Sequence, residues 1–159
     1  MKKNAKTHSI KESARQIAGF VAKFDGRMGK FIRSARSAVR RRFPTAIELV
    51  YDNYNFLVFG FCSTERASDA IVSLTANAQG MGLCFIYGAK LADPAKILQG
   101  SGNQTRFIRL ESAATLAKPE VERLLAAAIR QAKTPLPSSG RGYTVIKSIS
   151  KKQRPRRIV

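Results

Sequence analysis

Apolar residues recur at helical spacing in three parts of the chain. The first part begins at Ser9, which forms a capping box with the acidic residue three positions later, and it continues to about residue 22. The second follows Asp25 and should end at Phe43, because a proline disfavours helical geometry in the residue before it. The third begins at Pro119 and carries an apolar stripe as far as residue 132. The pattern therefore predicts two N-terminal helices and one C-terminal helix.

Short stretches of β-type residues occupy most of the remaining chain. They cover residues 46–52, 56–63, 69–77, 81–87 and 106–111, and residues 143–149 alternate like a strand at the edge of a sheet. Most connections between them are too short for a crossover helix, and residues 52–55 have the composition of a hairpin turn. We therefore predict an α+β fold, in which two N-terminal helices and one C-terminal helix pack on a mostly antiparallel sheet of about five or six strands.

Length and composition favour one domain with basic ends. The chain has 159 residues, 44% of them hydrophobic, which suffices for a single core. We assign residues 1–8 to a disordered basic leader, 9–149 to a single α+β domain and 150–159 to a basic C-terminal tail. No apolar stretch approaches the ~20 residues that span a bilayer, so we expect a soluble, cytoplasmic protein. Cys62 and Cys84 lie in apolar strand segments and are expected to be buried and unbonded.

Positive charge is concentrated at the two ends of the chain. The formal net charge is +19; residues 1–42 hold 13 Lys and Arg against two acids, and residues 141–159 hold seven against none. The residues between are nearly neutral. Such a field attracts polyanions, so a nucleic acid, an anionic membrane surface or an acidic protein are the partners to consider. The oligomeric state does not follow from the sequence.

The leading hypothesis is a non-catalytic binding protein that contacts a nucleic-acid backbone without reading its sequence. Placed at 100° intervals, the basic residues of the second helix lie opposite its apolar arc and form a cationic stripe. With the tail, they give the predicted nucleic-acid-binding residues Arg33, Arg36, Arg40, Lys151, Lys152, Arg154, Arg156 and Arg157. The sequence leaves open whether this charge is functional or solubilising, and whether the tail is docked or free. Because the tail has few apolar groups to bury, we expect its removal to leave the domain folded.

Two alternative functions remain. One is a small-ligand or enzymatic pocket, formed where the turn at residues 51–55 and the Gly-rich loop at residues 100–106 would converge. Its predicted ligand-binding residues are Tyr51, Asp52, Asn55, Tyr87 and Arg106. The other is an interaction module for an acidic protein, which would use the same basic residues.

Catalytic and metal-binding constellations are not recognisable. His8 is the only histidine, both cysteines lie in strands, and the acids are scattered, so we predict no metal site and no cofactor. No serine lies in a nucleophile elbow, and His8 is poorly placed to serve a triad. We therefore predict no catalytic residue.

The stretch 88–94 is followed by Leu98, two glycines and Arg106. This segment resembles the signature of the YdhG-like domain family, a bacterial domain of unknown function. Residues 48–55, which contain the YDNYN block, and the ending at residues 146–157 are similar to one bacterial branch. The resemblance implies an antiparallel sheet with packed helices and little about activity. A relative is described as a frataxin-like iron chaperone, but that role needs an acidic surface, so iron binding is not carried over.

Overall fold

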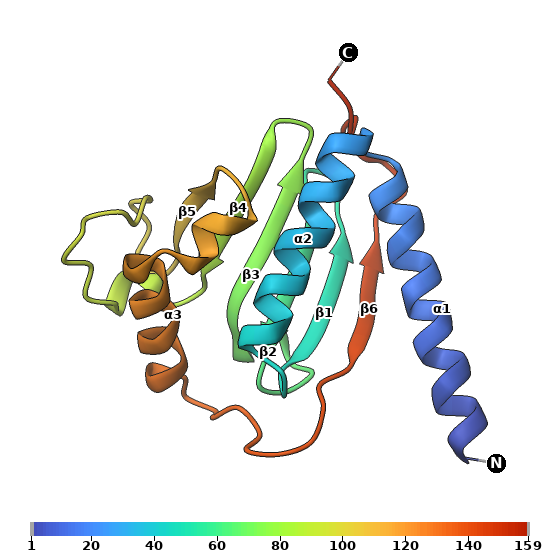
Figure 1. Ribbon diagram of the computed structural model, residues 1–159, viewed down its shortest axis with the longest axis horizontal. Helices are drawn as coiled ribbons and strands as arrows, with labels where there is room; N and C mark the ends of the chain where they lie inside the picture. Colours follow the sequence, from blue (N-terminus) through green and yellow to red (C-terminus); the bar gives the residue numbers. More distant parts are fainter. Residues whose placement is uncertain (1, 159) are drawn as a thin grey trace.

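The computed structural model describes the backbone of residues 2–158 and the side chains of residues 9–158. Its helices are α1 (Lys2–Ala22), α2 (Gly26–Arg42) and α3 (Pro119–Gln131), with short 3-10 turns η1 (Ala67–Asp69), η2 (Gly88–Lys90) and η3 (Ala113–Ala117). Its strands are β1 (Ile47–Asp52), β2 (Leu57–Cys62), β3 (Ala70–Asn77), β4 (Gly80–Phe85), β5 (Arg106–Leu110) and β6 (Thr144–Ile149). The predicted α+β fold is confirmed, with three helices on a six-stranded, mostly antiparallel sheet (Figure 1).

The sheet has the strand order β5-β4-β3-β2-β1-β6. Strands β1 to β5 form an antiparallel meander, whereas β6 returns after α3 and pairs in parallel with β1 at the edge. Because β1 and β6 run in the same direction, both end at the same end of the sheet. The C-terminal tail therefore starts beside Asp52, the last residue of β1.

One face of the sheet carries the core. Alternate residues of the strands, such as Phe59, Leu74 and Leu83, point toward α2 and α3, which lie on the viewer's side of the sheet in Figure 1. Helix α1 runs along the β6 edge and adds Phe20 and Phe24 to the same core. The opposite side of the sheet carries none of the three α-helices, and we call it the open face.

Helix α1 begins earlier than its capping box predicts. It starts at Lys2, so residues 2–8, predicted to be a disordered leader, continue the helix. No glycine or proline stands between Lys2 and Ser9 to end it.

Both cysteines are free thiols, as predicted. Cys62 is buried, and its burial, followed by the nearby charge of Asp69, raises its pKa to about 12. Cys84 was also predicted to be buried, but it is only half-buried.

Gly142, just before β6, fits where no other residue can. A Cβ atom built there would lie 1.8 Å from the Ala46 carbonyl oxygen and 2.7 Å from an Arg40 nitrogen. We expect Gly142→Ala to cost about 2–3 kcal/mol of unfolding free energy through overpacking, measured by thermal or urea denaturation. Gly102→Ala is the control, since nothing lies within 4 Å of its added methyl group. Equal stability of the two variants would contradict the close approach.

Candidate nucleic-acid interface

Two carboxylates lie buried on the helix-facing side of β1. Glu48 and Asp52 are four positions apart, so the period-two alternation of a strand places them on one face, and both are 0% exposed. An ionised carboxylate in the interior destabilises the fold unless cations and hydrogen bonds compensate it. Each carboxylate therefore needs basic partners from neighbouring elements.

Helix α2 supplies the partners of Glu48. Arg36 binds the carboxylate with both arms of its guanidinium, at 2.8 and 2.6 Å, and the Thr144 hydroxyl of β6 donates at 2.8 Å. Arg40 lies 3.7 Å from the same carboxylate and donates to the Ala46 carbonyl at 2.7 Å. Both arginines stack over rings of β2, Arg36 over Phe59 and Arg40 over Phe61.

Arg36 and Arg40 were predicted to bind nucleic acid, and the structure gives both of them partners within the fold. Their guanidinium groups face the sheet and hold α2 to β1. Placing every charged residue on the outer side of the helix was wrong here, because the buried Glu48 makes an inward arginine favourable.

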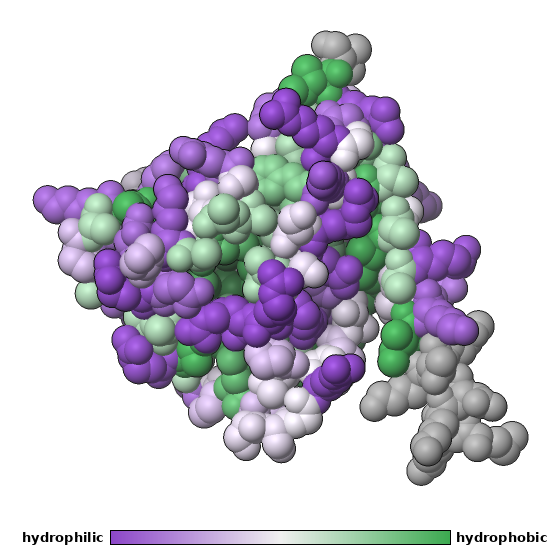
Figure 2. Space-filling view, viewed as in Figure 1, coloured by the Kyte–Doolittle hydropathy of each residue, from purple (hydrophilic) through white to green (hydrophobic). Residues whose placement is uncertain are grey.

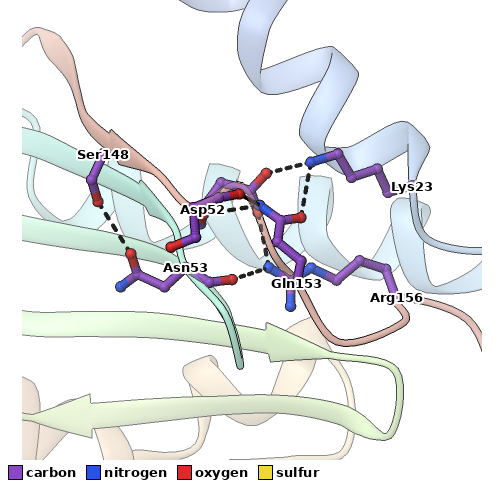
Figure 3. A network of polar contacts seen from close by, with 7 residues as sticks. Lys23, Asp52, Asn53, Ser148, Gln153 and Arg156 are labelled. Atoms are coloured by element: carbon purple, nitrogen blue, oxygen red, sulfur yellow. Dashed lines mark hydrogen bonds and ion pairs between the residues drawn. The ribbon is translucent and has the colours of Figure 1, made fainter.

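Asp52 joins three parts of the chain (Figure 3). Lys23, after the end of α1, donates to one carboxylate oxygen at 2.6 Å, and Arg156 of the tail donates to the other at 2.9 Å. Arg156 also donates to the Asn53 carbonyl at 2.6 Å. Gln153 donates to the Asp52 carbonyl at 3.0 Å and accepts from Lys23 at 3.0 Å. The tail is therefore docked, not free.

Arg156 is the least accessible cation of the tail. It is 5% exposed, and two of its nitrogens, Nε and Nη1, have no hydrogen-bond partner within the described part of the chain. Its guanidinium lies over the Phe24 ring, 5.9 Å from the ring centre, where the π face offers partial compensation. Arg156 was predicted to contact nucleic acid, and in the docked tail its side chain is instead buried against Asp52.

The Asp52 carboxylate stays ionised despite its burial. Burial by itself would raise its pKa, but hydrogen bonds from Lys23, Gln153 and Arg156, with the Lys23 charge, together hold the pKa below its usual value.

The exposed cations of α2 form a second set. We call it the outer stripe: Arg27, Lys30, Arg33 and Arg41. Hydrophilic side chains cover much of this face over α2 (Figure 2). Arg33 and Arg41, with Ser34 and Ser37, line a hollow of about 650 Å³ between α2 and η3. Of this stripe, only Arg33 was among the nucleic-acid-binding residues predicted from the sequence.

The exposed cations of the docked tail form a third set. We call them the tail cations: Lys151, Lys152, Arg154 and Arg157. The backbone of Arg154 donates to the Tyr54 carbonyl at 2.9 Å, and its guanidinium lies over the Tyr54 ring. Arg157 donates to the Lys23 carbonyl at 3.3 Å. The tail cations therefore lie near the start of α2, at the upper end of the molecule in Figure 1.

The predicted small-ligand pocket does not form. Asp52 pairs with Leu57 at one end of the sheet, whereas Arg106 pairs with Phe85 at the other end, and three strands separate β1 from β5. The residues 51–55 and 100–106 therefore do not converge. Arg106 instead donates to the carbonyls of Gly102 and Thr105 in its own loop.

The remaining predicted ligand residues are also dispersed. Tyr51 is half-buried on the open face, and Asn55 is exposed in the turn after β1. Tyr87 donates its hydroxyl to the Ser68 carbonyl at 2.6 Å, near the Arg106 end of the sheet.

Comparisons with known proteins add no assignment. No protein-family model, curated protein or solved structure matches the chain. None of the described helices is long and apolar enough to cross a membrane. Among the described side chains, no three His, Cys, Asp or Glu residues gather as a metal site would require, and His8 lies outside those side chains.

Removal of the Arg156 side chain should destabilise the fold. Asp52 would keep only the half-exposed Lys23 as a cationic partner, so we expect Arg156→Ala to cost about 3 kcal/mol of unfolding free energy. The neighbouring exposed Arg157→Ala is the control and should cost less than about 1 kcal/mol. Deletion of residues 151–159 should destabilise at least as much as Arg156→Ala, contrary to our expectation from the sequence. Urea denaturation measures all three, and an unchanged midpoint for Arg156→Ala would contradict the docking.

Asp52 also predicts a pH dependence. Because its pKa is lower in the folded state than the ~3.9 of an unfolded chain, its contribution is present above that value and is lost as pH falls through the folded pKa. The stability difference between wild type and Asp52→Asn should therefore be constant near neutrality and shrink below about pH 4. Denaturation at a series of pH values measures it. A difference that persists unchanged to about pH 2 would refute the assignment.

Proposed function

We propose that this protein is a non-catalytic binding protein that contacts a nucleic-acid backbone through the outer stripe and the tail cations. The observation that carries the proposal is the partition of charge between the interior and the surface. Glu48 and Asp52 are buried, and among the acids of residues 9–158 the exposed ones are Asp25, Glu65 and Glu111. Most of the formal charge of +19 therefore stays on the surface, where few acids lie beside the cations.

The outer stripe suits a row of phosphates. From Arg27 to Arg41 it extends over about 20 Å of a helix that is fixed on its other side by Arg36, Arg40 and the core. Cations on a rigid element lose little conformational entropy on binding. Contacts of this type position a nucleic acid without reading its sequence.

An acidic protein is the competing partner, because it would meet the same cations. Counterion release distinguishes the two, since a nucleic acid carries a condensed atmosphere of counterions that binding releases. The resemblance to the YdhG-like family remains a proposal and favours neither partner.

Neutralising the outer stripe should flatten the salt dependence of nucleic-acid binding. For a variant with Arg27, Lys30, Arg33 and Arg41 all changed to Gln, we expect the slope of log affinity against log salt to fall by about 0.9 per lost contact on duplex DNA, or about 0.7 on a single strand. Fluorescence anisotropy with mixed-sequence oligonucleotides measures the slope.

A charge-matched control tests location rather than net charge. Lys96, Lys118, Arg123 and Arg130 are exposed elsewhere, and changing all four to Gln removes the same formal charge. This control variant should keep most of the wild-type slope of log affinity against log salt. Equal losses in both variants would show that only net charge matters, and no binding by the wild type would refute the proposed function.

A further inference from the structure

The open face of the sheet carries a floor of small residues between large ones. In one cross-strand row, Leu49 faces Gly60, then Ser73, Cys84 and finally Phe107. In the next row, Tyr51 faces Val58, then Thr75, Gly82 and finally Arg109. The side chains at the centre of this face are therefore short, and the longer side chains of Phe107 and Arg109 project from its β5 side.

Two hollows continue across this side of the molecule. One, of about 360 Å³, lies over Gly82 and extends between Phe56 and Phe107. The other, of about 560 Å³, lies between the tail and the hairpin turns and is lined by Arg154 and Arg157. Phe56, Asn77 and Gln79 line both, so the two hollows are neighbours, and we call them together the channel.

The side chains of the channel combine three chemistries. Phe56, in the turn before β2, and Phe107, on β5, are 39% and 41% exposed. Arg109 lies beside them, held by a hydrogen bond of 3.1 Å to the Gln79 carbonyl. Carboxamide side chains of Asn77 and Gln79 lie between the aromatic residues and the tail cations. None of the described residues that line the channel is acidic.

Glycine keeps the floor of the channel flat. A Cβ atom at Gly82 would lie 3.1 Å from the Thr75 hydroxyl and would rise into the space beside Phe107. Without it, a flat group can lie against the sheet next to an exposed ring.

We propose that the channel binds a single-stranded nucleic acid, with bases stacked on Phe56 and Phe107 and phosphates at Arg109, Arg154 and Arg157. The inference rests on the proposed function and specifies its substrate class. Unpaired bases offer the flat faces that exposed aromatic residues bind, whereas the bases of a duplex are already stacked. An apolar helix would leave three arginines without counter-charge, and an acidic peptide would leave the two rings unused.

The test compares three probes of equal length, about 12 nucleotides: a mixed-sequence single strand, an abasic single strand and a duplex. We expect Phe56→Ala and Phe107→Ala each to weaken binding of the single strand by about 5- to 150-fold, with the salt slope unchanged. Neither variant should alter binding of the abasic strand, which has phosphates but no bases. Arg109→Gln should flatten the salt slope for both single strands.

Tyr143→Ala is the matched control. Tyr143 is 44% exposed and lies next to Glu48, at the end of β1 away from the tail. Its removal should leave single-strand binding unchanged. An equal loss in Tyr143→Ala and Phe107→Ala would overturn the proposal.

A second measurement locates the strand. Gln79 is exposed and lines both hollows, so a thiol placed there by Gln79→Cys, with Cys84→Ser, reports directly on the channel. The single strand should slow its labelling severalfold, and the duplex should not. Labelling that is unaffected by a bound single strand would overturn the proposal.

The outcomes separate this inference from the proposed function. One set of results would exclude the channel and leave backbone binding standing. In that set, all three probes bind equally, the Phe variants bind as the wild type does, and the outer-stripe variant loses its salt dependence. If no probe binds, both fail.

Discussion

The burial of the Glu48 and Asp52 carboxylates is the constraint around which the fold is arranged. Removing a carboxylate from water costs several kcal/mol, and only close cations with good geometry offset it. Glu48 obtains them from α2, and Asp52 obtains them from the residue after α1 and from the tail. Strand β1 therefore determines where both N-terminal helices and the last residues of the chain must lie. The two-armed contact of Arg36 adds a directional constraint to the apolar packing of α2 on the sheet.

The surface is one-sided because the chain holds 29 Lys and Arg against ten Asp and Glu. Acids placed inside neutralise inward-facing cations, and the cations left outside have few acidic neighbours. The basic residues of this chain thus divide into two classes that composition does not distinguish. Arg36, Arg40 and Arg156 stabilise the interior, whereas the outer stripe and the tail cations are available to a partner.

Local patterns in the sequence were sufficient for the elements but not for their mutual placement. The proline at residue 44 and the short connections predicted the end of α2 and the antiparallel meander correctly, because these depend on neighbouring residues. The direction of Arg36 depends on a residue twelve positions away. The signal was present, since Glu48 stands at an inward position of an apolar strand and requires a cation. The supposed pocket failed for a related reason: strand order decides which loops meet, and residues 52 and 106 are separated by the width of the sheet.

Docking of the tail fixes the tail cations in place relative to the outer stripe. A free basic tail would lose conformational entropy when it bound a polyanion. Here Arg156 is buried against Asp52, and the backbone of Arg154 is hydrogen-bonded to Tyr54. The loss of conformational entropy therefore occurs during folding rather than on binding. Arg154 and Arg157 are thereby fixed at the end of the molecule where α2 begins and where the channel opens. A nucleic acid that follows the outer stripe would reach the tail cations before the channel, and the buried Arg156 would act on affinity as a positioning residue without touching the ligand.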